Sequence, residues 1–63
     1  MAIVIYGGRC FLLNIGSIVL VEYNGRHYEC EVIRILLCSG HYFFIVAEID
    51  DYLDGSNLVE VIR

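Results

Sequence analysis

The dipeptide Asn24-Gly25 lies between two runs of alternating apolar residues, and it constrains the fold more than any other feature. A two-residue type I′ turn requires positive φ at both central residues, which Asn-Gly tolerates well. The sequence therefore predicts a β-hairpin in which Tyr23 lies opposite Arg26. Alternation along the second strand separates an inner face from an outer face, with Tyr28, Cys30 and Val32 inside and His27, Glu29 and Glu31 outside.

The other glycines divide the rest of the chain into short runs of similar composition. These runs are rich in Val, Ile, Tyr and Phe, which suit a pleated, half-buried surface, and none keeps a helical period. Proline is absent. The pattern predicts a single all-β domain over residues 1–63, with five or six short antiparallel strands.

Two segments depart from simple alternation. After Val32 the pattern slips, which predicts a β-bulge near Ile33-Arg34 or burial of both faces. The run from Phe43 to Ala47 is apolar on both faces, which predicts a central strand, or a strand covered by the N-terminal segment or by a second subunit. Bent strands with this much two-sided burial favour a small closed barrel, because closure removes exposed edges. An SH3-like barrel is the expected form, with a small OB-like barrel as the alternative.

The chain is more apolar than a domain of its size can hide. Hydrophobic residues make up 59% of its 63 residues, and the mean hydropathy is +0.69. A domain this small buries only about 60% of the surface that its unfolded chain exposes. We therefore expect self-association or permanent residence on a partner. The N-terminal segment "AIVIYGGRCFLL" is expected to be an extra strand or strand pair beyond the minimal SH3-like barrel, and it is the expected homo-oligomerisation element.

Charge narrows the class of partner. Eight acidic residues against four arginines and no lysine give a net charge of −4. The arginines are dispersed, so direct binding of a nucleic-acid backbone is disfavoured. The acidic residues from Glu48 to Asp54 predict attraction of a basic partner, or a solvated loop that keeps an apolar chain soluble.

The sequence contains no arrangement typical of a catalytic or metal site. No nucleophile elbow, phosphate-binding loop or metal-ligand cluster is present, so we expect a non-enzyme without metal or cofactor. Cys10, Cys30 and Cys38 lack a CxxC spacing and are expected to be small buried apolar residues. The uncharged stretches fall short of the roughly 20 residues of a spanning helix, and no secretory signal pattern is evident. A cytoplasmic location is the default expectation.

Residues 16–63 resemble the Tudor and Agenet branch of SH3-like domains. The resemblance begins with Gly16, continues through the strand that ends at Tyr23 and through the Asn-Gly turn, and extends to Ile35. It resumes in "IVAEIDDYLDGSNLVEVIR", where Asp51-Tyr52 stands at the Asp-Tyr pair of the family. The Gly-Asn that follows this pair in the family is replaced here by Leu53-Asp54.

The resemblance implies an aromatic cage at the strand ends that binds a methylated Lys or Arg. Cation–π contacts of this kind contribute about 0.5–2 kcal/mol each. Tyr23, Tyr28 and Tyr52 fall at three cage positions, and Ile49 stands at the fourth. The expected binding residues are Tyr23, Tyr28, Ile49, Asp51, Tyr52 and Asp54. In the alternative, the tyrosines pack the edges of the core with their hydroxyls in water.

The sequence supports two functional hypotheses. The first is a Tudor-like protein-interaction module that binds a basic or Arg-rich peptide segment, methylated or unmethylated. The second is a small acidic accessory or inhibitor protein of a virus or mobile element, which docks onto a larger protein such as a nucleic-acid-binding one.

Overall fold

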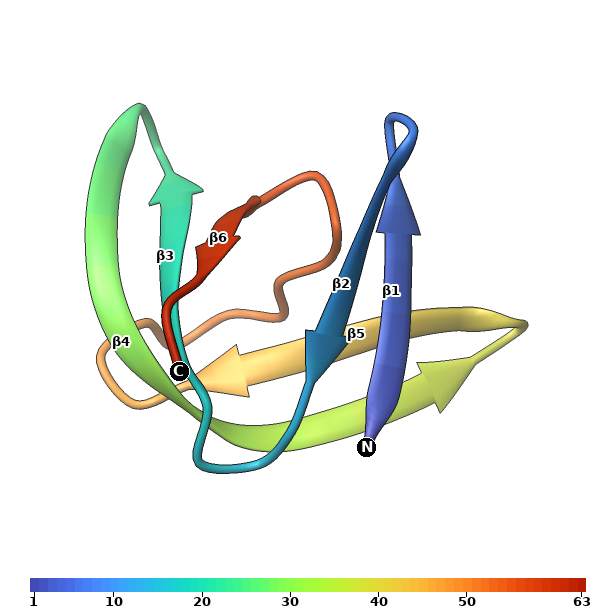
Figure 1. The fold of residues 1–63 in the computed structure, drawn as a ribbon. Coiled ribbons are helices and arrows are strands. Elements are labelled where there is room, and N and C mark those ends of the chain that lie inside the picture. The colour runs from blue at the N-terminus through green and yellow to red at the C-terminus, as the bar shows by residue number, and fades with distance from the viewer.

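The computed structural model describes all 63 residues and contains six β-strands and no helix (Figure 1). The strands are β1 (Ala2–Tyr6), β2 (Arg9–Leu13), β3 (Ile18–Tyr23), β4 (Arg26–Cys38), β5 (His41–Val46) and β6 (Leu58–Val61). No helical segment suited to crossing a membrane is present. All paired strands are antiparallel, so the predicted all-β class is confirmed.

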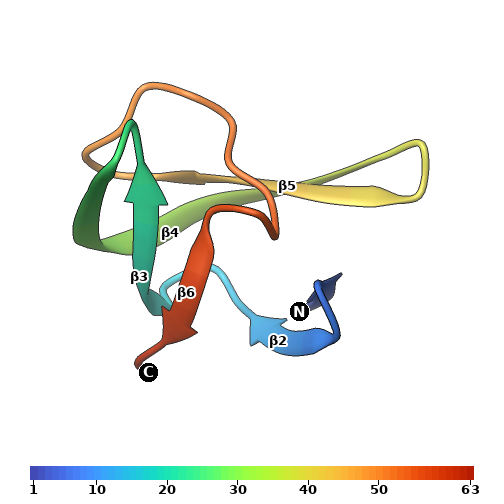
Figure 2. The same cartoon turned by 90° about the horizontal axis from the view of Figure 1, so that it is seen from above.

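The strands form two sheets. The β1–β2 hairpin is a sheet of its own, and the other four strands are ordered β5-β4-β3-β6. The N-terminal hairpin runs across the direction of β5, and β2 lies next to β6, the edge strand at the other end of the larger sheet (Figures 1 and 2). The hydrogen-bonded strands do not close into one ring, so the expected closed barrel is not formed. Of the expected N-terminal strand or strand pair, the structure has the pair, as a two-stranded hairpin.

Three tight turns fix the strand register. Each has positive φ at both central residues, as a type I′ turn requires: Gly7 and Gly8, Asn24 and Gly25, and Ser39 and Gly40. The predicted hairpin at Asn24-Gly25 is confirmed, with Tyr23 opposite Arg26. The turn at Ser39-Gly40 has a weaker sequence signal, because serine rarely adopts the left-handed conformation.

Strand β4 is 13 residues long and belongs to two hairpins. Its first part pairs with β3 and its last part with β5, and the ribbon bends between them (Figure 1). The register shifts between Val32 and Arg34, which confirms the predicted bulge. The faces are also as predicted, since Cys30 and Val32 are buried while Glu29 and Glu31 are exposed.

The core is one cluster of 13 buried residues that draws on both sheets. The larger sheet supplies Val19, Val21, Cys30, Val32, Phe44, Val46 and Leu58, the segment after β5 supplies Ile49 and Leu53, and the N-terminal hairpin supplies Ala2, Val4, Phe11 and Leu13. Full burial of one such side chain stabilises the fold by about 1.5–3 kcal/mol. The N-terminal hairpin is therefore a layer of the core and not an appendage.

The two sheets meet at two close contacts. Beside β6, the Arg9 guanidinium donates to the Val59 carbonyl and lies 4.7 Å from the centre of the Phe11 ring. At the other contact, a Cβ at Gly55 would approach Cβ of Tyr6 to 2.7 Å, so only glycine fits without a shift. These contacts are made by side chains and by a loop, so the strand ladder does not continue from β2 to β6.

Strand β5 is an edge strand, so of the alternatives that the sequence left open the central strand is wrong, and the covered strand remains. It pairs with β4 on one side, and on the other side only Phe44 is bridged, to Leu53. Phe44 and Val46 are buried, while Phe43 and Ile45 are half-buried. The apolar character of both faces therefore reflects partial cover by the rest of the domain and not pairing on both edges.

Replacing Phe44 with alanine should destabilise the domain far more than Phe43→Ala does. Phe44 is fully buried, so its truncation is expected to cost about 3–5 kcal/mol, a large share of the stability of a domain this small. Phe43 is its neighbour on the opposite face and is only half-buried. Urea denaturation followed by circular dichroism measures both, and a larger loss for Phe43→Ala would contradict this core.

Candidate functional site

The Asp51 carboxylate is the centre of the predicted binding region. The Tyr23 hydroxyl donates a hydrogen bond to its Oδ2 at 2.7 Å, although the two residues are 28 positions apart in the chain. The backbone N–H of Tyr52 donates to Oδ1 at 2.8 Å. Two donors thus hold the carboxylate beside the Tyr23 ring, and the group remains exposed to solvent.

Tyr23 and Tyr28 continue the inner face of the β3–β4 hairpin beyond the core. Tyr28 lies opposite Val21, and Tyr23 lies opposite Arg26 near the turn. Both tyrosines are half-buried and pack against the core cluster. Turn geometry and alternation therefore bring the two rings to one end of the core, where each keeps part of its surface in water.

The neighbouring carboxylates favour the neutral form of the Tyr23 hydroxyl. The hydrogen bond to Asp51 is the main reason that the pKa of Tyr23 is raised above its ordinary value, with smaller contributions from burial and from the negative charges of Asp51 and Asp50. The hydroxyl is thus a fixed donor to Asp51. A cation placed here would meet two carboxylates and an aromatic ring.

The other three predicted residues lie elsewhere. Ile49 is buried in the core, so it does not form a wall of a surface cage. The Tyr52 side chain is 61% exposed and lines an apolar hollow of about 480 Å³, together with Leu36, Leu37, Cys38 and Phe43. Asp54 shapes a turn, since its Oδ1 accepts from the backbone N–H of Ser56 at 2.9 Å. Of the six predicted residues, the structure brings together Tyr23, Tyr28 and Asp51.

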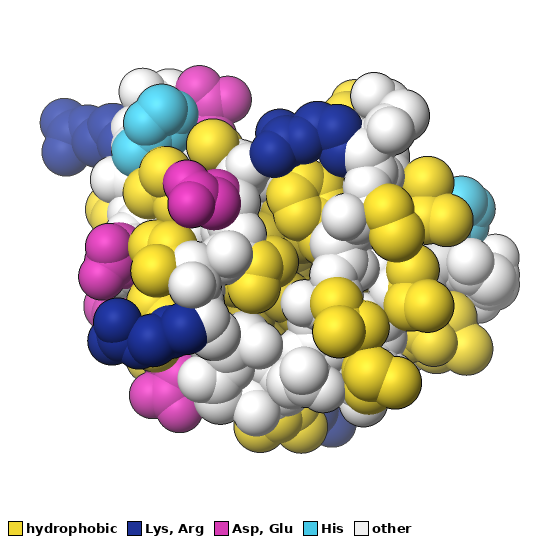
Figure 3. Space-filling model, in the orientation of Figure 1, with side chains coloured by type: hydrophobic (Ala, Val, Ile, Leu, Met, Phe, Trp, Pro, Cys, Tyr) yellow, Lys and Arg dark blue, Asp and Glu magenta, His cyan; other side chains and the backbone are white.

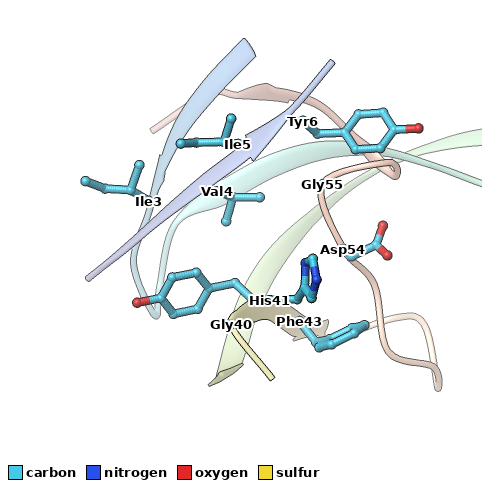
Figure 4. Close-up of a pocket in the computed structure, with 10 residues that line it drawn as sticks. Ile3, Val4, Ile5, Tyr6, Gly40, His41, Phe43, Asp54 and Gly55 are labelled. Atoms are coloured by element: carbon cyan, nitrogen blue, oxygen red, sulfur yellow. The ribbon is translucent and has the colours of Figure 1, made fainter. Parts of the chain in front are cut away.

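Neither Tyr23 nor Tyr28 lines a hollow, and the largest hollow lies at a place that was not predicted. It has a volume of about 560 Å³ and is lined by residues 3–6 of β1, residues 40–43 at the start of β5, and Asp54 and Gly55 (Figure 4). Val4 points toward the His41 and Phe43 side, while Ile3 and Ile5 point away (Figure 4). The sequence signal for this hollow was the uncharged run "AIVIY".

The cysteines and carboxylates do not assemble into a metal-binding group. No cluster of three or more His, Cys, Asp or Glu side chains has the proximity to hold an ion. Cys30 is buried as predicted, and its burial, with the nearby charge of Glu48, raises the pKa of its thiol. Cys10 and Cys38 are exposed, so their predicted burial is wrong: Cys10 is on the outer face of a two-stranded sheet, and Cys38 adjoins a hairpin turn.

No known protein family, curated protein or solved structure matches the chain. A function for this protein is therefore inferred from its own residues and their geometry.

Replacing Asp51 with asparagine should lower the pKa of Tyr23 toward its ordinary value of about 10. The substitution removes the charge that disfavours the phenolate, and Asp50→Asn, which removes only a more distant charge, should lower the pKa less. Because the folded pKa is raised, the neutral Tyr23 stabilises the fold below pH of about 10, and this contribution disappears as pH rises through the folded pKa. An NMR titration of the tyrosine ring protons measures each shift, and an unchanged pKa in Asp51→Asn would contradict the assigned bond.

Proposed function

We propose that this protein is a non-enzymatic interaction module, Tudor-like in form, that binds a cationic, Arg-rich peptide segment at Tyr23, Tyr28 and Asp51. The observation that carries the proposal is the 2.7 Å hydrogen bond from the Tyr23 hydroxyl to Asp51. It holds a carboxylate oxygen beside an aromatic ring, and Asp50 adds a second negative charge nearby.

An arginine side chain suits this surface better than a lysine. Its planar guanidinium donates in a fork that matches a carboxylate, and it stacks on aromatic faces. The surface offers an exposed carboxylate together with half-buried tyrosine rings. The net charge of −4 adds attraction at long range, which raises the rate of association with a basic partner.

The SH3-like form is part of the proposal. The β3–β4–β5 meander, with its long bent central strand and with β6 beside β3, supports it.

A methylated cation is expected to gain little over an unmethylated one. A full cage surrounds the methyl groups with several aromatic rings, but Tyr52 lines a separate apolar hollow and Ile49 is buried. Two rings and a carboxylate favour a charged, hydrogen-bonding guanidinium. We therefore propose binding that depends on charge more than on methylation.

A second candidate is the accessory protein that docks an apolar face onto a larger partner. The hollow lined by Leu36, Leu37, Cys38, Phe43 and Tyr52 favours it, because its lining is apolar throughout. Leu37 and Tyr52 are 63% and 61% exposed. Docking there would leave the Tyr23–Asp51 hydrogen bond undisturbed.

An NMR titration of the labelled protein with a short Arg-rich peptide tests the proposal. We expect shifts centred on Tyr23, Tyr28 and Asp51, and binding that weakens with added salt. Asp50→Asn combined with Asp51→Asn should weaken binding by about tenfold or more, since a charge-assisted hydrogen bond is worth roughly 1.5–3 kcal/mol.

The matched control is Glu29→Gln combined with Glu31→Gln, which removes the same formal charge from the outer face of β4. Equal losses for the two double variants would mean that the peptide responds only to net charge. Shifts confined to Leu36, Leu37 and Tyr52 would favour the second candidate. A titration with the dimethylated peptide should give an affinity within a few-fold of the unmethylated one.

A further inference from the structure

The outer edge of β1 is an unpaired strand edge. Strand β1 pairs only with β2, and the turn at Gly7-Gly8 makes Tyr6 and Arg9 the hydrogen-bonded pair that closes the hairpin. Alternation then directs the N–H and C=O groups of Val4 toward β2. Those of Ile3 and Ile5 point away from it.

The other two hairpins of this chain have the same alternation, and in each of them an outward-pointing N–H group forms a hydrogen bond. Glu22 lies one pair below the closing pair of its hairpin, and its outward N–H donates to the Asn57 carbonyl at 2.8 Å. In the third hairpin, the outward N–H of Phe44 donates to the Leu53 carbonyl at 2.8 Å. The outward groups of Ile3 and Ile5 have no strand beside them.

The space beside this edge is open, and its lining is mainly apolar, with His41 and Asp54 as the charged or titratable members. The 560 Å³ hollow is lined by four successive residues of β1 and by none of β2, so it follows the free edge (Figure 4). The β4–β5 hairpin extends past β1 in both views (Figures 1 and 2), and its residues Tyr42 and Phe43 line the same hollow as β1. A strand laid along β1 would therefore lie over this hollow.

The charge distribution leaves this end of the molecule open to a second copy. All eight acidic side chains lie within residues 22–31 and 48–60, and β1 carries no charged side chain. The acidic side chains gather over β3, β4 and β6, whereas apolar side chains cover β1 and the nearby hairpin end (Figure 3). Asp54 lines the hollow beside β1, but pairing through β1 itself places no like-charged side chains directly opposite each other.

We propose that the free edge of β1 pairs antiparallel with the same edge of a second copy, about a two-fold axis at Val4. In this register, Ile3 lies opposite Ile5 of the second copy, and Ile5 lies opposite Ile3 of that copy. These are the residues whose backbone groups are free, so the pairing forms four hydrogen bonds without disturbing either hairpin. The two hairpins become one four-stranded sheet ordered β2-β1-β1-β2.

The side chains support the same register. Ile3 and Ile5 are 53% and 73% exposed on the outer face. The proposed pairing places Ile3 of one copy against Ile5 of the other, on both sides of the axis. Apolar pairs directly opposite each other are the stabilising unit of an antiparallel sheet. In each copy the outer edge of β1 is free, while its inner edge is paired with β2. The two free edges can therefore pair without any unfolding.

The test compares three proteins by size-exclusion chromatography with light scattering, from about 1 µM to about 1 mM. The unmodified chain should approach twice its 7.2 kDa mass as concentration rises. Ile3→Lys combined with Ile5→Lys places like charges opposite each other and should weaken the dimer by more than about tenfold. Ile3→Lys combined with Ile5→Glu places opposite charges across the axis and should restore most of the association, now in a salt-dependent form.

Both positions are exposed, so each variant should keep the circular dichroism spectrum of the unmodified chain. A monomer of unmodified protein at about 1 mM would overturn the proposal, as would a dimer that survives both lysine substitutions. Failure of the Lys/Glu variant to recover would overturn the register. Peptide binding at Asp51 is a separate measurement, so its success or failure does not affect this result.

Discussion

The positive φ angles at three two-residue turns are the constraint on which the rest of this structure depends. Each turn fixes which residues face one another, and a strand side chain points to the opposite face if the register slips by one. At Asn24-Gly25 the register places Val21 opposite Tyr28 inside and Glu22 opposite His27 outside. A slip of one residue would direct carboxylates into a core that otherwise contains only apolar side chains.

The same constraint separates the molecule into two surfaces of different chemistry. At one end, the β3–β4 hairpin carries the inner face beyond the core and presents tyrosine rings beside Asp51. At the other end, the β1–β2 hairpin presents exposed Ile3 and Ile5 and an unpaired strand edge. Strand β1 thus presents part of the apolar excess of the sequence and no carboxylate of its own. The two proposed binding surfaces are formed by different residues.

Local features were predictable from the sequence because turn chemistry and alternation act over a few residues. The Asn24-Gly25 hairpin, its register, its faces and the bulge after Val32 are all confirmed. The proximity of Tyr23 and Tyr28 followed from that register.

Features that depend on contacts distant in sequence were not predictable in the same way. Two-sided hydrophobicity in β5 suggested a central strand, but partial cover by the rest of the domain produces the same pattern in an edge strand. The resemblance placed Ile49 in a cage wall, yet the segment after β5 turns it into the core. The Tyr52 ring lines the apolar hollow together with Leu36, Leu37, Cys38 and Phe43, and no local pattern encodes these contacts with the distant β4–β5 hairpin.

Backbone hydrogen exchange at residues 3, 4 and 5, followed by NMR over a range of protein concentrations, tests the central claim most directly. The turn-set register predicts that the Val4 N–H is protected at every concentration, because it is bonded to β2. The N–H groups of Ile3 and Ile5 should exchange rapidly in dilute protein and become protected as concentration rises. Rapid exchange at Val4, or protection of Ile3 and Ile5 that is independent of concentration, would contradict the account.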